Sequence, residues 1–223
     1  YSKDQHVEKT IDDLGFSGKL LTTDHDYLNI IGTNLGGTKT DLKIEQNVDL
    51  KSKVLSDGSI INSLNITRSN LASVNNKTYI RILVPLGSEF VSAKGFDPVV
   101  THPSAALGLH QDSDLVAWDK GVQQSDVFIR TETGKTEFAG WLAVEPGASR
   151  TVTINYILPF KIGSAHSLLL QKQAGSKPYK FNASLDLGRY DVSWTTNGVK
   201  KFGSNLSFGS DSNIDDFWGF VIN

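Results

Sequence analysis

Residues 41–67 read DLKIEQNVDLKSKVLSDGSIINSLNIT, and this stretch decides the fold class. From Leu42 to Leu50, apolar side chains fall at nearly every second position, with charged or amide side chains between them. The segment from Ile60 to Ile66 alternates in the same way. Asp57-Gly58 lies between the two segments and is a preferred pair for a type I′ turn. The stretch therefore predicts two antiparallel β-strands with one wet face, joined as a hairpin.

The same two-residue period recurs along most of the chain. It is present at residues 80–84, 127–131, 136–144, 152–158, 179–187 and 190–194, and the chain ends in an apolar strand at 217–222. Pro146-Gly147 predicts a type II turn between two of these strands, and Asn197-Gly198 predicts a second hairpin. Many short strands with frequent turns are typical of a sandwich or barrel, and one polar face on each strand favours antiparallel sheets packed face to face. We predict an all-β fold, an antiparallel β-sandwich that is Ig-like or related.

A short helix is expected ahead of the strands. Val7, Ile11 and Leu14 recur at helical spacing, and Gly15 can end the helix. We therefore predict a lead-in helix and linker over residues 1–24. The sandwich domain is expected to follow over residues 25–223, with a possible sub-boundary near 160–166.

The inward face of each predicted strand gives the expected core. Those side chains are apolar and share one face of their strand, so they should be buried between the sheets. The predicted core residues are Leu42, Ile44, Leu64, Ile66, Ile80, Ile82, Val84, Val152, Ile154, Tyr156, Phe181 and Leu185.

Composition excludes several classes of function. The chain has 223 residues, a net charge of −2 and a pI of about 6.2, and no Lys/Arg run exceeds Lys200-Lys201. A nucleic-acid partner is therefore not expected, since such proteins carry basic stripes. No apolar run approaches the ~18 residues of a membrane span. Cys and Met are both absent and the chain opens at Tyr1, which predicts a fragment or processed chain without thiolate chemistry.

The longest segment without a strand pattern, residues 95–121, holds the candidate ligand-binding residues. Asp112, Asp114 and Asp119 lie close together there, with Trp118 among them. Carboxylate oxygens suit Ca²⁺, and a Trp beside carboxylates suits a sugar ring. The alternative is a solvated loop whose Trp covers the end of the sandwich. We expect no required metal and no cofactor, and keep these four residues as ligand-binding candidates.

Other motifs fail where their chemistry requires a particular residue. Asp211, Asn213 and Asp215 imitate the start of an EF-hand loop, but Asp216 replaces the required Gly and Ile222 the required Glu. A turn before the last strand is the better interpretation. The chain has neither an H-E-x-x-H nor a G-x-S-x-G motif. We therefore predict no catalytic residues and no enzymatic activity.

An ordered set of segments resembles a known bacterial family. The segments are Asp26-Tyr27-Leu28, Asn34 to Lys39, Tyr79 to Ser88, Ser92 to Gly95, Val144 to Gly147, Ser149 to Val152, Tyr156 with Leu158-Pro159, and Leu170 to Gly175. Over roughly residues 24–185 they resemble, in this order, the C-terminal β region of the domain of unknown function 4012 family. Several of the shared residues end strands or make turns, which is a feature of fold rather than of function.

The resemblance implies a place in a larger protein. Members of that family resemble large envelope proteins with an N-terminal membrane anchor and an extracytoplasmic remainder. Their most recognisable segment, Asn-Asn-Ala-Glu-Leu-Arg-Pro-Thr-Gly-Gly, lies upstream of the part that this chain resembles. The resemblance implies no activity and no catalytic residues.

The sequence thus favours a non-catalytic extracytoplasmic module of a bacterial cell-envelope protein, structural or ligand-binding. Its expected partners are other domains of the same protein, or a cell-surface protein or glycan. The alternative is a carbohydrate-active enzyme or glycan-binding domain that uses the acidic loop at 95–121.

Overall fold

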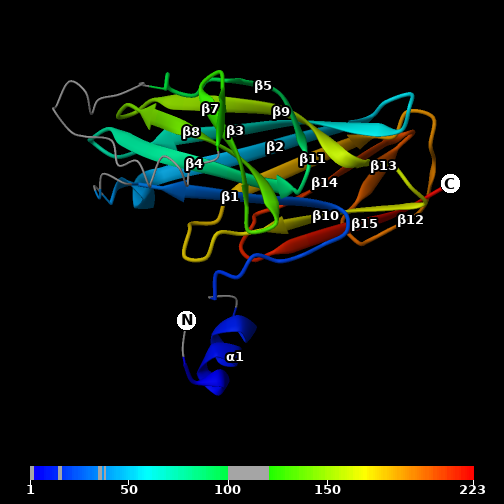
Figure 1. The fold of residues 1–223 in the computed structure, drawn as a ribbon, viewed down its shortest axis with the longest axis horizontal. Coiled ribbons are helices and arrows are strands. Elements are labelled where there is room, and N and C mark those ends of the chain that lie inside the picture. The colour runs from blue at the N-terminus through cyan, green and yellow to red at the C-terminus, as the bar shows by residue number, and fades with distance from the viewer. Residues whose placement is uncertain (1–2, 15–16, 35–36, 38, 100–120) are drawn as a thin grey trace.

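The computed structural model describes residues 3–14, 17–34, 37, 39–99 and 121–223. These residues form two β-sheets that pack face to face, and a short helix stands apart from them (Figure 1). The predicted all-β sandwich with an N-terminal helix is confirmed.

Within the described residues, the first sheet has eight strands and the second has seven. In spatial order the first sheet contains β12 (Val192–Thr195), β15 (Asp216–Ile222), β10 (Ala165–Gln171), β1 (Asp26–Thr33), β4 (Asn76–Pro85), β8 (Lys135–Val144), β7 (Val127–Glu132) and β6 (Val122–Gln124). The second contains β13 (Lys200–Phe202), β14 (Asn205–Ser210), β11 (Lys180–Asp186), β2 (Ile44–Val54), β3 (Ser59–Asn70), β9 (Ser149–Lys161) and β5 (Glu89–Lys94).

Each sheet contains one parallel strand pair. β1 runs parallel to β10, with Tyr27 opposite Leu169, and β2 runs parallel to β11, with Asp49 opposite Asn182. The sheets are thus mixed, where the sequence predicted antiparallel ones. Alternation within a strand reveals its buried face but not the direction of its neighbour.

The chain crosses repeatedly between the two sheets. Strands at matching places in the two spatial orders are mostly neighbours along the chain, as with β1 and β2, β8 and β9, or β10 and β11. Both sheets therefore grow outward from the central β1 and β2, and each is completed only by the last strands of the chain.

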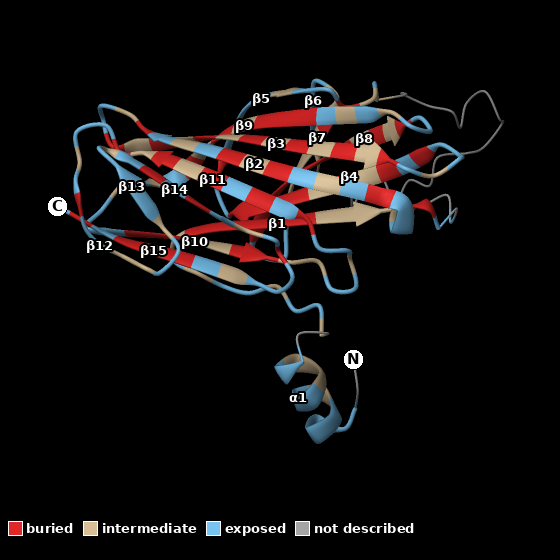
Figure 2. Cartoon of the chain, turned by 180° about the vertical axis from the view of Figure 1, so that it is seen from behind, coloured by how far each residue is buried: buried red, intermediate tan, exposed pale blue. Residues whose placement is uncertain are grey.

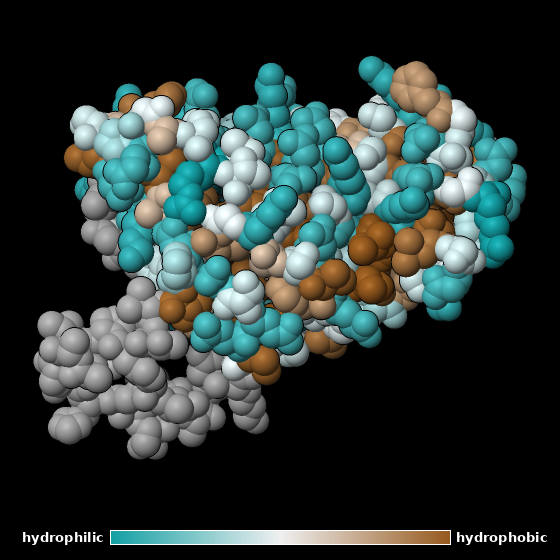
Figure 3. Space-filling model, turned by 90° about the horizontal axis from the view of Figure 1, so that it is seen from above, coloured by the Kyte–Doolittle hydropathy of each residue, from teal (hydrophilic) through white to brown (hydrophobic). Residues whose placement is uncertain are grey.

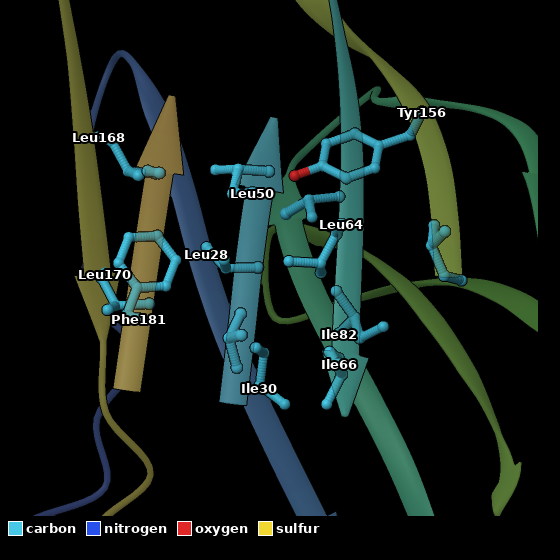
Figure 4. Packing of buried hydrophobic residues seen from close by; sticks show 14 of the residues in the cluster. Leu28, Ile30, Leu50, Leu64, Ile66, Ile82, Tyr156, Leu168, Leu170 and Phe181 are labelled. Atoms are coloured by element: carbon cyan, nitrogen blue, oxygen red, sulfur yellow. The ribbon is translucent and has the colours of Figure 1, made fainter. Parts of the chain in front are cut away.

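Apolar side chains fill the space between the sheets. Every second residue of β3 is buried (Figure 2). Side chains from both sheets point toward one another in the space between them (Figure 4). All but one of the predicted core residues are buried. The exception is Leu42, which is 73% exposed. Leu42 lies in the 3-10 turn η1 (Thr40–Lys43), and the strand begins only at Ile44, so the predicted register does not extend back to it.

The outer face of the second sheet is polar. Hydroxyl groups pair across its strands, with Thr67 Oγ1 at 2.8 Å from Thr151 Oγ1 and Ser69 Oγ at 2.6 Å from Ser149 Oγ. On the face shown in Figure 3, hydrophilic side chains cover much of the surface, and hydrophobic ones form several patches between them. The alternation in sequence therefore separates a dry interior from a wet surface, as expected for a sandwich.

The hairpin at Asp57-Gly58 forms with a different turn from the one predicted. The backbone N–H of Gly58 donates to the carbonyl oxygen of Leu55 (3.0 Å), and that of Leu55 donates to Ser59 (2.8 Å). Gly58 has a φ of +88°, whereas Asp57 keeps a negative φ. A type I′ turn needs positive φ at both central residues, so the prediction of that turn type is wrong. The connection is a three-residue loop with its glycine in the left-handed region.

The other two predicted turns have opposite outcomes. At Pro146-Gly147, the N–H of Ala148 donates to the carbonyl of Glu145 (3.1 Å) and Gly147 has a φ of +72°, as a type II turn requires. At Asn197-Gly198 the predicted hairpin is wrong, because β12 and β13 belong to different sheets. This turn carries the chain across the sandwich instead.

The helix α1 (Gln5–Asp13) is capped but not packed. The Asp4 carboxylate accepts hydrogen bonds from the backbone N–H groups of His6 and Val7, and the helix buries none of its residues. No helix in the described part of the chain has the length and apolar character that crossing a bilayer needs.

The predicted domain boundary between residues 24 and 25, and the predicted sub-boundary near 160–166, stay predictions.

Asp26 is enclosed between the sheets at the start of β1. It is 2% exposed, and its carboxylate accepts hydrogen bonds from Asn62 Nδ2 (3.1 Å) and from the backbone N–H of Tyr27 (2.8 Å). Burial raises the pKa of Asp26 to about 7, because the desolvation of the charged form outweighs these two hydrogen bonds. The carboxyl is therefore neutral at mildly acidic pH.

The core register can be tested on β9. We expect Ile154→Ala to lower the free energy of unfolding by about 2–5 kcal/mol, because Ile154 is fully buried between the sheets. Ile157→Ala, in the same strand but on the opposite, partly exposed face, should cost clearly less. Denaturant melts of both variants measure the difference, and equal losses would show that the strand faces are misassigned.

Asp26 should make stability depend on pH. The folded pKa of about 7 lies above the ordinary 3.8, so the folded protein holds the proton more tightly and loses stability as pH rises from about 4 to 7. The loss amounts to about 4 kcal/mol at most. Asp26→Asn, neutral at every pH, should melt higher than wild type at pH 8, and the gap should close toward pH 4. Asp24→Asn, exposed next to it, is the control and should leave the pH profile unchanged.

Candidate functional site

The inward face of the sandwich becomes polar at one end. Along β3 the inward series runs from Leu64 and Ile66 into Arg68 and Asn70, all of them buried. In β4, Thr78 and Asn76 likewise precede the apolar inward residues and are fully buried. Polar groups from both sheets therefore meet where the apolar core ends.

Arg68 is the charged group at the centre of this polar end. It is 5% exposed, and its Nη2 donates to Asp41 Oδ1 at 3.2 Å. Its Nε has no partner among the described residues. Burial lowers the pKa of the guanidinium and the carboxylate of Asp41 opposes this, but arginine stays protonated in proteins. A permanent positive charge is thus held between the sheets with one acidic partner.

A hydrogen-bonded network holds Asp41 in place. Asn76 Nδ2 lies 3.0 Å from Asp41 Oδ1 and 2.7 Å from Thr40 Oγ1, and Thr78 Oγ1 donates to Asn76 Oδ1 (3.0 Å). The turn η1 supplies both Thr40 and Asp41, and Lys39 enters it with a left-handed φ of +54°. The Asp41 side chain is still 44% exposed, so water reaches the acidic partner more easily than it reaches Arg68.

A pocket of about 290 Å³ opens beside Arg68. Ile30, Gln46, Tyr179 and Lys177 are among its lining residues, together with the segment 173–176. Two hydrogen bonds of the Gln173 side-chain amide hold that segment against the end of β1. Gly32 N–H donates to Gln173 Oε1 (3.0 Å), and Gln173 Nε2 donates to the Gly32 carbonyl (3.2 Å). The pocket is therefore bounded by both sheets and by a connection from β10 to β11.

A second cluster of charges lies on the outer face of the first sheet. Glu137 is 1% exposed, and its carboxylate accepts a hydrogen bond from Arg81 Nε. Arg130 Nη1 lies 3.7 Å from Glu137 Oε1. Arg130 also donates to the Tyr79 hydroxyl (3.1 Å), whose ring packs on Trp141 at 5.0 Å between centroids. Burial raises the pKa of Glu137 although Arg81 opposes it. The charged groups of this second cluster are already paired with one another. The cluster therefore has less capacity to bind a ligand than Arg68 has.

The candidates Asp112, Asp114, Trp118 and Asp119 lie outside the described residues, so their roles stay predictions. Residues 211–215 form the connection between β14 and β15, as expected, and Asp215 accepts a hydrogen bond from the backbone of Lys172 (2.8 Å). Across the described ranges, no group of three His, Cys, Asp or Glu side chains could hold a metal ion.

Sequence reasoning missed the pocket at Arg68. The available signal was an arginine at an inward position of β3, directly in line with Leu64 and Ile66. When a charged residue continues the apolar face of a predicted strand, either the predicted strand register is wrong there or the charge is buried with a partner. The pairing with Asp41 and the covering segment 173–176 depend on tertiary structure and left no local pattern.

The fold defines a two-sheet β-sandwich, and comparison with known proteins shows no more than that class. No protein-family model and no curated protein matches the chain. Among solved structures, a proposed nutrient-binding protein from Legionella pneumophila is similar, with a TM-score of 0.50 and 8% identity over 88% of this chain and 71% of that one. An identity this low shows a shared fold alone.

An M1 zinc metallopeptidase from Deinococcus radiodurans is a weaker match. The TM-score is 0.34 with 10% identity, over 81% of this chain and 42% of the peptidase. The match thus spans less than half of the peptidase's length.

The Arg68–Asp41 pair should respond unequally to removal of each partner. Asp41→Asn leaves a buried cation without its counter-charge and should lower the free energy of unfolding by about 2 kcal/mol, below the 3–5 typical of fully buried pairs because water reaches Asp41. Arg68→Met leaves a hydrated carboxylate and should change stability by less than about 1 kcal/mol. Denaturant melts measure both, and a larger loss for Arg68→Met would contradict the assignment.

Proposed function

We propose that this chain is a non-catalytic binding module of a larger bacterial cell-envelope protein, and that its ligand site is the pocket at Arg68. The observation that carries the proposal is a buried arginine that has an unpaired donor and lines a pocket between the sheets. Ligand pockets combine apolar walls with a few convergent polar groups, and this pocket has both.

The placement in the cell envelope is supported by the ordered segments that resemble the family named above. Several of those segments are strands and turns of the sandwich, including β4 and the turn at Pro146-Gly147. A module of this kind would have other domains of the same protein as its immediate partners. The nutrient-binding role proposed for the similar Legionella protein is compatible with a binding module, but that likeness is one of fold.

The chemistry of the pocket supports a non-catalytic role. Among the lining residues that the structure describes, the charged ones are Arg68, Asp41 and Lys177, and none is a histidine or a second carboxylate. General acid–base catalysis needs a group whose pKa lies near the working pH, within reach of the substrate. A permanently charged arginine instead binds and orients an anionic or polar group.

The proposal is tested by a thermal-shift screen of the full chain. The panel would hold small acids, amines, neutral sugars and short peptides at millimolar concentration. At a hundredfold excess over its dissociation constant, a ligand should raise the stability by about 2.7 kcal/mol, which is about 5–10 °C for a domain of this size. We expect at least one compound to stabilise wild type and to lose its effect in Arg68→Met.

Arg189→Met is the matched control, because Arg189 is an exposed arginine outside the pocket. It should respond to the same compounds as wild type. A panel that stabilises nothing, or compounds whose effect persists in Arg68→Met, would count against a ligand site in this pocket.

A further inference from the structure

The guanidinium of Arg68 has more donors than its surroundings use. Arginine carries five N–H donors, and the structure gives Arg68 a single hydrogen bond, from Nη2 to Asp41. Nε is buried and has no partner in the described residues. The hydrogen bond that Arg68 makes there comes from Nη2, not from Nη1. The unused donors belong to a side chain that is 95% removed from water, where unsatisfied hydrogen-bonding capacity is costly.

Gly32 leaves room beside this guanidinium. A Cβ at position 32 would lie 2.9 Å from Arg68 Nη1, closer than carbon and nitrogen can normally approach. The φ of Gly32 is not in the left-handed region, so the backbone conformation does not itself require glycine. The absence of a side chain at Gly32 therefore allows Nη1 to occupy its position, where the end of β1 borders the pocket.

The charges that line the pocket do not balance. Arg68 and Lys177 are positive, and Asp41 is the only acid among the lining residues that the structure describes. Lys177 is exposed, and its ammonium donates long hydrogen bonds to the carbonyl oxygens of Leu42 (3.3 Å) and Ile44 (3.4 Å). One net positive charge in a partly dry site attracts an anion more strongly than a surface charge does.

Part of the remaining wall is apolar. Ile30, Ile44, Pro178 and Tyr179 line the pocket, together with the polar residues Gln46, Gln173 and Ser176. Its volume of about 290 Å³ lies just below the usual range for small-molecule sites, which is about 300–1,000 Å³. The pocket thus suits a small molecule that has one charged end and one apolar end.

We infer that the pocket binds a small carboxylate with an apolar body, whose carboxylate is held by Arg68. The inference rests on the proposed binding function and names its ligand class. A carboxylate matches the planar fork of a guanidinium and can bond to Nη1 and Nη2 together. Asp41 occupies Nη2 in the free protein, so it is an internal competitor for the same donors.

The test is a titration of the full chain with benzoate, against benzamide as the neutral molecule of the same shape. We expect benzoate to bind wild type and to shift the backbone NMR signals of Gly32 and Gln173, and benzamide to bind at least tenfold more weakly. Asp41→Asn should bind benzoate several-fold more tightly, because it removes the competing charge. Added benzoate should also recover part of the stability that this variant loses.

Two variants guard against loss of the fold. Arg68→Met is expected to stay folded and to lose benzoate binding, while the Arg189→Met control keeps it. Gly32→Ala should push the guanidinium aside and weaken benzoate at least fivefold, with the circular dichroism spectrum unchanged.

The outcomes separate the two proposals. If benzamide binds as well as benzoate, and Arg68→Met abolishes both, the pocket is a binding site but not one for carboxylates, and this inference is overturned alone. If benzoate binds Arg68→Met and wild type equally, the inference is likewise overturned. If neither benzoate nor any compound of the wider panel binds, both the proposed binding function and the inference of a carboxylate ligand are overturned.

Discussion

The space between the two sheets excludes water, and this constraint governs every inward-facing residue. A large apolar side chain contributes about 1.5–3 kcal/mol when it is buried there. A polar group costs free energy unless it finds a partner, and a charge costs far more. The central strands therefore carry leucine, isoleucine and valine inward, and their few inward polar residues have to be accounted for one at a time.

Asp26 and Arg68 meet this constraint in different ways. The Asp26 carboxyl can become neutral by taking up a proton, and its raised pKa shows that burial favours this form. Arginine has no such option, because it stays charged at all ordinary pH. The free protein therefore keeps a charge at Arg68, and the Asp41 carboxylate bonds to its Nη2 alone. An anion that entered the pocket would supply a second counter-charge.

The two-residue period predicted most strands and nearly all of the core, because the residues buried on one face of a strand can be recognised from the strand's own sequence. It failed at Leu42, since a residue in a 3-10 turn can continue the apolar spacing of the strand that follows. The turn signal failed at Asn197-Gly198, because it is the same whether the chain returns to its own sheet or crosses to the other. The site at Arg68 needed contacts with Asp41 and with segment 173–176, which lie far away in sequence.

The two parallel pairs have a consequence for the way the protein is made. Asp26 of β1 lies opposite Leu168 of β10, so a ribosome adds about 142 further residues before that pairing can begin. At ~5–20 residues per second this takes on the order of 7–28 s. During that time β1 and β2 can pair with β4 and β3, but each keeps one open edge at what will become the middle of its sheet. Open edges accept strands from other chains, so nascent chains need shielding from one another until β10 and β11 have been synthesised.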